Sequence, residues 1–338
     1  MKHIICLSIF LSAIACTKKQ SDSEAKKVEA GTAEQKVWTS NSALEELGYH
    51  LYFEKRLSGD NSISCNTCHD ITAGNAGVDG LPTSVGINGQ KGERNSPTVF
   101  NAKFLSVQFW DGRAKDLAEQ AKGPITNPIE MGMESHDLAI DKIKDVKGYQ
   151  ELFAKAFPDQ ENPINIDNLA TAIAAFEETL TTLDSPYDKF KEGDLEALSE
   201  LQKKGYEAFQ SVGCVSCHSG PHFAGPSLPI GTGFFMKFPT FPDADYENKY
   251  HFSEDLGRYN VTKNETDKNM WRVPTLRNVA RTAPYFHNGK VESLDEAVKV
   301  MAKMQLNKDI AEDEAKAIVA FLESLNGNIP LINEPKAL

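Results

Sequence analysis

The sequence contains little cysteine for its 338 residues, and what it has is unevenly placed. The six cysteines stand at positions 6, 16, 65, 68, 214 and 217, as two single residues and two close pairs. Small secreted proteins that depend on disulfide bonds rarely show this spacing, so a disulfide framework is not expected. Basic residues are also few, since 36 Lys and Arg stand against 48 Asp and Glu, and the formal net charge is −12. Without a basic run, the sequence argues against a protein that binds nucleic acid.

Glycine and proline follow no period, and beyond its first residues the sequence lacks a long apolar run. The 23 Gly and 16 Pro therefore do not indicate a fibrous protein. Hydrophobic residues make up 40% and charged residues 25% of the chain, which is typical of a globular protein. A chain of this length can bury a substantial core, and we expect one large domain or two of medium size.

The first residues have the pattern of an export signal. Lys2 precedes an apolar run over residues 4–14, and small residues lead up to Cys16. The run is too short to span a bilayer, so we predict a signal peptide over residues 1–15. A cysteine directly after a small residue resembles the signal of a bacterial lipoprotein, which predicts a lipid on Cys16 and a periplasmic protein tethered to the outer membrane. The alternative is an ordinary signal peptide with an incidental cysteine. The polar residues 16–37 are predicted to be a flexible tether.

The four remaining cysteines form two copies of Cys-x-x-Cys-His, the signature for covalent attachment of a c-type haem. Two thiols three positions apart on a helical turn reach the two vinyl groups of one porphyrin, and the adjacent histidine lies under the iron. A zinc site would need all four cysteines to converge and would leave the histidines without a role. We therefore predict two covalent haems, one on Cys65, Cys68 and His69 and the other on Cys214, Cys217 and His218.

Most of the chain is predicted to be helix and loop. Apolar residues recur at three- and four-residue steps over residues 166–183, as on one face of a helix. Asp194 is expected to cap a second helix, which leads the chain to Cys214. Residues 70–100 and 219–280 are rich in Gly, Pro and Asn, and we predict long loops around the cofactors there.

The distance between the two haem motifs predicts the domain organisation. The motifs begin at residues 65 and 214, which is far enough apart for each haem to have its own domain. We predict an N-terminal haem domain over residues 38–190 and a C-terminal haem domain over residues 191–338. Similar helical patterns precede the two motifs, and an internal duplication would explain them.

The function depends on the second axial position of each iron, because two strong ligands give an electron carrier and an open position gives an enzyme. Residues 70–135, which follow the first motif, contain no histidine. They do contain Glu130 and Trp110, which by themselves suggest a solvated surface group and a core residue. For the second haem several ligands are possible, and core packing explains any single methionine equally well. These candidates are His222, Met236, His251, Met270, His287, Met301 and Met304.

Several segments match a known family in order along the chain. Besides both haem motifs, they are residues 89–101, 108–114, 123–131, 273–278 and 283–287. These segments resemble bacterial di-haem cytochrome c peroxidases. The resemblance implies a mainly α fold of two cytochrome c-like helical haem domains with long loops, usually as a homodimer.

The resemblance also implies roles for the haem ligands. The haem on His69 would be the low-potential peroxidatic centre. The other haem, with His218 and Met301 as axial ligands, would be the high-potential centre. A calcium ion between the domains would be bound through hard oxygen ligands at Asn95, Thr282 and Pro284.

The activity implied by the resemblance is the reduction of hydrogen peroxide to water. Glu130 would be the distal acid–base residue that carries a proton from the near to the far oxygen as the O–O bond breaks, and Gln120 would be a distal amide. Electrons would come from a small redox protein, such as a cytochrome c or a copper protein, through the second haem and Trp110.

One position departs from the family pattern. Many members carry a histidine there that ligates the peroxidatic iron at rest, but this sequence has Ile87. Because isoleucine cannot coordinate iron, we predict a five-coordinate or water-bound first haem in the oxidised protein, with no need of reductive activation. Met131 or Met133 is the alternative ligand.

Two other functions fit the motifs. A non-enzymatic di-haem electron carrier would share both haem motifs and would need no distal acid. A di-haem enzyme that oxidises a protein substrate, like the one that matures tryptophan tryptophylquinone, resembles this sequence as well. In that group a tyrosine replaces the axial methionine, so Met301 favours the peroxidase, whereas Ile87 in place of the histidine favours the protein-oxidising enzyme.

Overall fold

A computed structural model describes Met1 and residues 36–338 of the chain. Residues 2–35 lie outside the described part of the chain. The signal peptide, the lipid attachment at Cys16 and most of the tether therefore stay predictions. Within the described part, none of the helices combines the length and the apolar character needed to cross a membrane.

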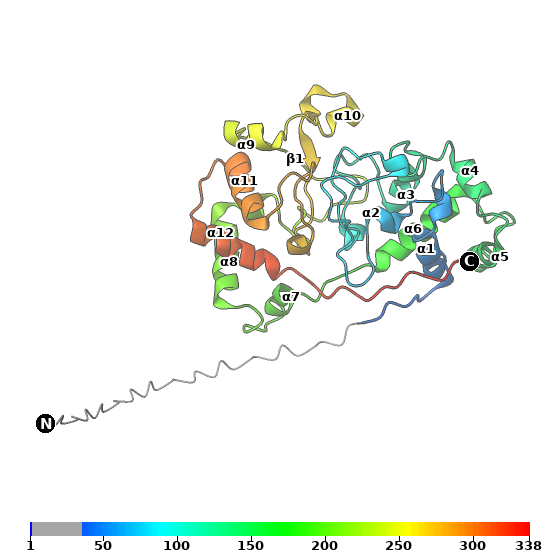
Figure 1. Cartoon of the computed structure of the whole chain (residues 1–338), viewed down its shortest axis with the longest axis horizontal. Coiled ribbons are helices and arrows are strands. Elements are labelled where there is room, and N and C mark those ends of the chain that lie inside the picture. Colours follow the sequence, from blue (N-terminus) through cyan, green and yellow to red (C-terminus); the bar gives the residue numbers. More distant parts are fainter. Residues whose placement is uncertain (2–35) are drawn as a thin grey trace. The chain divides into compact units, whose positions relative to one another are not determined.

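The described chain is mainly helical, which confirms the predicted fold class (Figure 1). Its two short strands, β1 (Phe235–Lys237) and β2 (Met270–Arg272), pair antiparallel, with Met236 opposite Trp271. The α-helices are α1 (Ala43–Tyr52), α2 (Cys65–Cys68), α3 (Leu117–Thr126), α4 (His136–Asp141), α5 (Lys147–Ala156), α6 (Ile166–Thr179), α7 (Pro186–Lys191), α8 (Glu200–Val212), α9 (Ala244–Tyr250), α10 (Tyr259–Thr262), α11 (Leu294–Leu306) and α12 (Glu312–Glu323). The 3₁₀ turns are η1 (Lys55–Leu57), η2 (Ile87–Gly89), η3 (Ala102–Phe104), η4 (Cys214–Ser216), η5 (Glu265–Asp267) and η6 (Val279–Arg281).

The start of α8 differs from the prediction. The helix begins at Glu200, where the Ser199 hydroxyl accepts from the Gln202 backbone N–H and the Gln202 side chain accepts in return from the Ser199 backbone. This capping box satisfies two N–H groups that would otherwise lack partners. The Asp194 carboxylate accepts from the Glu196 backbone N–H instead, within the turn before the helix. The expected cap at Asp194 is therefore wrong.

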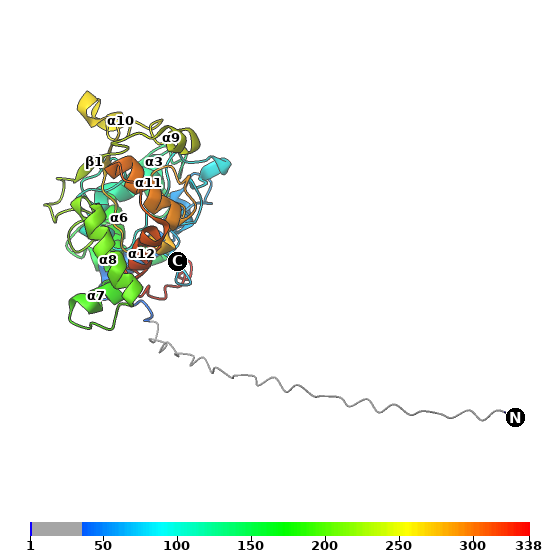
Figure 2. The same cartoon turned by 90° about the vertical axis from the view of Figure 1, so that its left-hand side faces the viewer.

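Two pairs of helices cross closely at glycine, one pair in each half of the described chain. α1 packs on α6, and a Cβ atom on Gly48 would lie 1.9 Å from the backbone oxygen of Ala172. α8 packs on α12 in the same way, and a Cβ atom on Gly205 would lie 1.8 Å from the oxygen of Ala317. In Figure 1 these pairs lie toward opposite ends, and Figure 2 looks from the side of α8 and α12.

The buried apolar residues follow the same division. Two clusters draw on residues 47–180, and two others draw on residues 209–325. The segment after α12 returns to the first half, where Ile329 and Ile332 join the cluster around Phe176. Leu331 also pairs with Val37 in a short parallel bridge. The domain boundary near residue 190 stays a prediction. That prediction did not include the packing of the C-terminal segment on the first half.

Both halves repeat one local structure after the haem motif. Thr98 donates its hydroxyl proton to the Ala76 carbonyl oxygen, and Thr275 donates to the His222 carbonyl oxygen. Three residues further on, Asn101 and Asn278 both adopt left-handed backbone, with φ of 64° and 61°. Each asparagine then begins a 3₁₀ turn, η3 in the first half and η6 in the second. The shared turns support an internal duplication.

We predict that Gly48→Ala destabilises the protein, although alanine favours an isolated helix over glycine by about 1 kcal/mol. The added Cβ would force α1 and α6 apart, and overpacking of this kind costs about 1–3 kcal/mol. Denaturant unfolding of the haem-loaded protein measures the change. Gly92→Ala is the control, because its Cβ would lie 3.6 Å from the nearest atom. Equal stability of the two variants would contradict the prediction.

Candidate haem and catalytic site

The first haem motif forms α2 and the residue after it. The His69 backbone N–H donates to the Cys65 carbonyl oxygen, so the imidazole follows directly from the helical turn. Its Nδ1 lies 2.9 Å from the Pro97 carbonyl oxygen, which leaves Nε2 for a ligand. Burial lowers the pKa of His69, which favours the neutral form that can bind a metal. Cys65 and Cys68 are free thiols beside it.

The second motif is built in the same way around η4. His218 is buried, and its Nδ1 lies 3.0 Å from the Phe223 carbonyl oxygen. Cys214 and Cys217 are free thiols, and with His218 they line a cavity that holds about 1580 Å³ of empty space including its mouth. Met301 lines the same cavity from α11. The structure therefore brings together the thiols, the imidazole and the thioether predicted for the second haem.

Polar groups on the cavity wall fit a haem with its carboxylates. Arg272 is buried, and its side chain donates to the carbonyl oxygens of Phe109 and Val273. Burial lowers the pKa of this guanidinium to about 10, because the charged form has lost its water. His287 Nε2 is buried without a hydrogen-bond partner among the described residues. A haem propionate is the kind of anion that would offset such a buried cation.

A hairpin of the first half reaches this cavity. The Gln108 N–H donates to the Ala114 carbonyl oxygen and closes the hairpin, whose tip carries Trp110. The Trp110 indole N–H donates to the Asn95 carbonyl oxygen at 2.9 Å, and the ring packs on the core cluster of the second half. Trp110 therefore belongs to the first half and packs on the second, and its predicted role in electron transfer stays a prediction. The second half repeats the hairpin between Tyr285 and Val291, with His287 at the position of Trp110.

The helices that follow these hairpins carry the largest chemical difference between the halves. Asp116 caps α3 and Ser293 caps α11, at equivalent places after the two hairpins. Met301 lies as many residues after Ser293 as Pro124 lies after Asp116, so the two positions correspond. A thioether can ligate iron, whereas proline has no side-chain donor atom. The duplicated scaffold thus carries a side chain that could ligate iron in the second half and none at the equivalent place in the first.

Glu130 follows α3 in a tight turn. Asn127 donates from its side-chain amide to Glu130 Oε1 at 2.8 Å, and the Ile87 backbone N–H donates to the Glu130 carbonyl oxygen. Burial raises the pKa of Glu130, while the Arg113 guanidinium and the Asn127 hydrogen bond act in the opposite direction. Burial raises the pKa of the Cys68 thiol to about 11, and the Asp79 and Glu130 carboxylates act in the same direction. Gln120 lies on α3, one turn before Pro124.

The three residues predicted to bind calcium come together on the cavity wall. Asn95, Thr282 and Pro284 all line the cavity that His218 lines. Asn95 donates from its side-chain nitrogen to the carbonyl oxygens of Leu81 and Pro82, which turns its amide oxygen away from those acceptors. Calcium binding itself stays a prediction.

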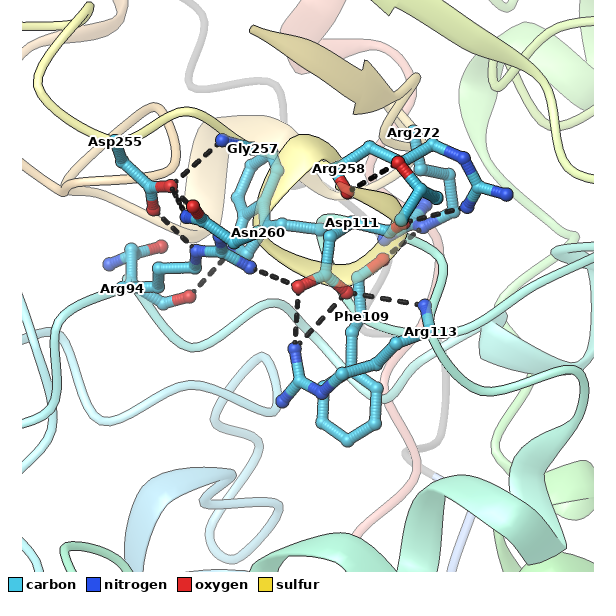
Figure 3. Close-up of polar contacts among 12 residues, drawn as sticks. Arg94, Phe109, Asp111, Arg113, Asp255, Gly257, Arg258, Asn260 and Arg272 are labelled. Atoms are coloured by element: carbon cyan, nitrogen blue, oxygen red, sulfur yellow. Dashed lines mark hydrogen bonds and ion pairs between the residues drawn. The ribbon is translucent and has the colours of Figure 1, made fainter. Parts of the chain in front are cut away.

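Sequence reasoning missed an arginine–aspartate network beside Trp110 (Figure 3). Arg94 pairs with Asp111 at 2.5 Å and with Asp255 of the second half at 2.6 Å. Asp111 also accepts from Arg113 at 2.9 Å. Asp111 and Arg113 follow Trp110 closely in the sequence, but nothing in the sequence pairs Arg94 with Asp255, which lies far along the chain.

The whole site matches one known family. Residues 42–196 match the family described as di-haem cytochrome c peroxidase. A cytochrome c551 peroxidase of Pseudomonas aeruginosa is 48% identical over 290 residues, which are 86% of this chain and 80% of that protein. The chain belongs to the di-haem cytochrome c peroxidase family.

Other relatives agree with this assignment. A cytochrome c551 peroxidase of Nitrosomonas europaea is 45% identical over 294 residues, which are 87% of this chain and 83% of that protein. The solved structure of a MauG-like protein associated with microbial copper homeostasis has a TM-score of 0.74 at 26% identity, covering 87% of this chain and 93% of that one. The predicted family and the predicted enzyme class, cytochrome c peroxidase, are confirmed.

We predict that Pro124→Met closes the first haem site. A methionine there would stand where Met301 stands in the second half, and its thioether would ligate the first iron. The oxidised variant should show an additional low-spin haem in its EPR spectrum and lose most of its reaction with peroxide. Pro128→Met, four residues further on, is the control. A spectrum identical to that of the wild type would contradict the equivalence of the two positions.

Proposed function

We propose that this peroxidase reduces hydrogen peroxide to water at the haem of the first half, with electrons that a small redox protein delivers to the haem of the second half. The observation that carries the proposal is the contrast between Met301 and Pro124 on equivalent helices. A closed second site suits electron transfer, and an open first site leaves room for a substrate. A cytochrome c or a small copper protein is the donor that we expect.

A haem bound at His69 would supply the iron and the oxidising power for cleavage of the O–O bond. The chain's own part is to fix that haem and to handle protons. Cys65 and Cys68 would hold it covalently, and the Pro97 carbonyl oxygen orients the imidazole of His69. The finer proposal of covalent attachment for both haems rests on the two Cys-x-x-Cys-His motifs and on their free thiols.

Glu130 is the proton carrier in this proposal. Its carboxylate is held by Asn127 and its backbone by Ile87, so that the group is fixed before substrate arrives. The carboxylate would accept the proton of the near peroxide oxygen and return it to the far oxygen, which leaves as water. Gln120, on α3 one turn before Pro124, would offer its amide as a hydrogen-bond donor to the substrate.

Glu130→Gln is expected to keep its haem content and lose about 10²–10⁴-fold in turnover, because an amide cannot accept the proton. Steady-state peroxide reduction with a reduced cytochrome c measures the loss. Glu134→Gln, an exposed carboxylate four residues further on, is the matched control and should react like the wild type. Near-normal turnover of Glu130→Gln would overturn the assignment of the proton carrier.

Ile87 supports a first haem that is open at rest. Its side chain is buried and faces the backbone of Gly132, where a Cβ atom would lie 2.9 Å from Ile87 Cγ2. Its neighbour Gly86 packs closely on the Ile129 carbonyl oxygen. Gly86 and Ile87 therefore contact the turn that carries Glu130. We propose that the oxidised enzyme reacts with peroxide without prior reduction. Met131 and Met133 stay alternative ligands.

We predict that Ile87→His introduces the dependence on reduction that the wild type lacks. The new imidazole can ligate the first iron, so the oxidised variant should gain a low-spin bis-histidine signal and react with peroxide only after half-reduction. Ile87→Val is the control. Stopped-flow mixing of fully oxidised protein with peroxide, with EPR of the same samples, decides the matter. A bis-histidine signal in the wild type itself would refute the proposal.

The remaining proposals concern the electron path and the cellular setting. Trp110 would carry electrons between the halves, since it belongs to the first half and packs on the second. A calcium ion would lie at Asn95, Thr282 and Pro284, which line one cavity. The homodimer, the periplasmic location and the lipid anchor at Cys16 rest on the sequence.

A further inference from the structure

Three oxidisable aromatic side chains lead from the first haem motif to the surface of the first half. The Tyr52 hydroxyl donates to the His69 carbonyl oxygen at 2.7 Å. Tyr52 is fully buried on α1, and Tyr49 lies on the same face of the helix, three residues before it. The ring centroids of Trp38 and Tyr49 are 4.7 Å apart. Because these two rings are only half-buried, the series begins beside the proposed haem and ends at solvent.

Two phenylalanines connect the tyrosines. The centroid of the Phe176 ring on α6 lies 5.3 Å from that of Tyr52 and 5.6 Å from that of Tyr49. The Phe53 ring lies 5.5 Å from Tyr52 and 5.6 Å from Tyr49 by the same measure. These are the separations of packed aromatic rings. Cys65, which would hold the first haem, packs on the same apolar cluster. Since electron transfer weakens steeply with distance, rings in contact are suitable steps for it.

The second half repeats this arrangement with one difference. Counting from the glycine at each helix crossing, Phe209 of α8 corresponds to Tyr52 of α1. Tyr206 corresponds to Tyr49 in the same way. Phe209 lines the cavity of the second haem site together with Cys214. The first half therefore has a tyrosine at the position where the second half places a phenylalanine against its haem site.

The reaction proposed for the first haem needs two electrons to cleave the O–O bond. The iron of that haem would supply one of them. In the half-reduced enzyme the second haem would supply the other through Trp110. In the fully oxidised enzyme the second haem has no electron to give, so the protein itself has to supply it. Tyrosine and tryptophan are the side chains best suited to give up a single electron.

We propose that Tyr52 and Tyr49 form an electron route that supplies this missing electron when peroxide meets the fully oxidised enzyme. Tyr52 passes an electron to the first haem site and takes one from Tyr49, so that Tyr52 ends unchanged. Tyr49 loses one electron and its phenolic proton, which passes to water. One peroxide oxygen leaves as water with both peroxide protons, and the other stays at the haem site until the donor delivers electrons. The inference rests on the proposed reaction of the oxidised enzyme with peroxide.

The surroundings of Tyr49 suit the end of such a route. Its hydroxyl donates to the Asn333 carbonyl oxygen at an exposed position, where water can take up the proton. Trp38 packs on the ring and is fixed by the bond from its indole N–H to the Thr179 hydroxyl oxygen at 2.8 Å. An oxidised Tyr49 therefore lies where an external reductant can reach it. The route would protect the haem by moving an oxidising equivalent to the surface.

The first measurement is EPR of the fully oxidised di-haem protein, frozen after mixing with an equal amount of peroxide and no electron donor. We expect an organic radical whose signal narrows in protein labelled with ring-deuterated tyrosine. A spin trap added to the same mixture should be found on Tyr49 by peptide mass spectrometry. Both readouts are independent of turnover. The consumption of peroxide, measured in the same samples, shows whether the oxidised protein has reacted.

The variants Tyr52→Phe and Tyr49→Phe retain the rings and remove the oxidisable hydroxyl groups. Tyr49→Phe should lose most of the tyrosine radical. Tyr52→Phe should lose the adduct on Tyr49 although Tyr49 is still present, because the route is interrupted beside the haem. Both should bleach faster in excess peroxide, since the oxidising equivalent stays at the haem. Tyr206→Phe is the matched control, because it removes the equivalent half-buried tyrosine of the second half and should behave like the wild type.

Each outcome bears on the proposal. Loss of the Tyr49 adduct in Tyr52→Phe, with the adduct retained in Tyr206→Phe, supports it. An unchanged adduct in Tyr52→Phe, or an adduct on Tyr206 in place of Tyr49, overturns it. If Tyr52→Phe does not bind its haems, Tyr49→Phe decides, and an undiminished tyrosine radical there overturns the route.

The same samples separate failure of the route from failure of the proposed function. Wild-type protein that consumes peroxide without a tyrosine radical or adduct overturns the route and leaves the proposed function standing. Oxidised wild-type protein that consumes no peroxide shows that the proposed open first haem has failed, and the route fails with it.

Discussion

The arrangement of the two halves depends on a buried set of hydrogen bonds centred on Thr182. The side-chain amides of Asn101 and Asn278 both donate to its hydroxyl oxygen at 2.8 Å, and its backbone N–H donates to Asn101 Oδ1. The two asparagines are the equivalent left-handed residues of the repeat, so the duplicated turns meet at one residue. Gly327 N–H completes the set by donating to Asn278 Oδ1. Buried polar groups left unpaired are costly, so the halves have one arrangement that satisfies them all.

Because the two halves are similar and their arrangement is fixed, different residues at equivalent positions can give the halves different functions. Met301 carries a thioether where Pro124 has no donor atom, so the same scaffold would give the two proposed irons different coordination. At the tips of the equivalent hairpins Trp110 corresponds to His287, and both line the cavity of the second haem. Asp111 corresponds to the uncharged Asn288, so the carboxylate that Arg94 and Arg113 share is present only in the hairpin of the first half. In the proposed function, a few differences at equivalent positions would separate catalysis from electron transfer.

The sequence predicted the parts of this protein whose signals are local. The Cys-x-x-Cys-His motifs predict both haem sites, because covalent attachment would need thiols and an imidazole within one helical turn. Helix ends were harder, since Asp194 and Ser199 are both good capping residues and the reciprocal bonds with Gln202 favour Ser199. The pairing of Arg94 with Asp255 had no local signal, because it joins segments that only the completed fold brings together. The packing of Ile332 on the first half had no local signal either. Its burial depends on a core formed by residues far earlier in the chain.

The distribution of charge suggests that folding and haem binding support each other. The chain has a net charge of −12, yet three arginines, Arg94, Arg113 and Arg258, donate to Asp111 at the contact between its halves (Figure 3). Arg94 and Arg113 form ion pairs with Asp111, whereas the buried Arg272 side chain donates to carbonyl oxygens. A buried cation without a carboxylate is costly, and a haem carboxylate in the cavity that Arg272 lines would offset that cost. Because the Arg272 backbone N–H donates to the Trp110 carbonyl oxygen, the same residue that would meet the cofactor also holds the hairpin of the first half. Haem binding in the second half would therefore stabilise the hairpin on which the proposed electron transfer depends.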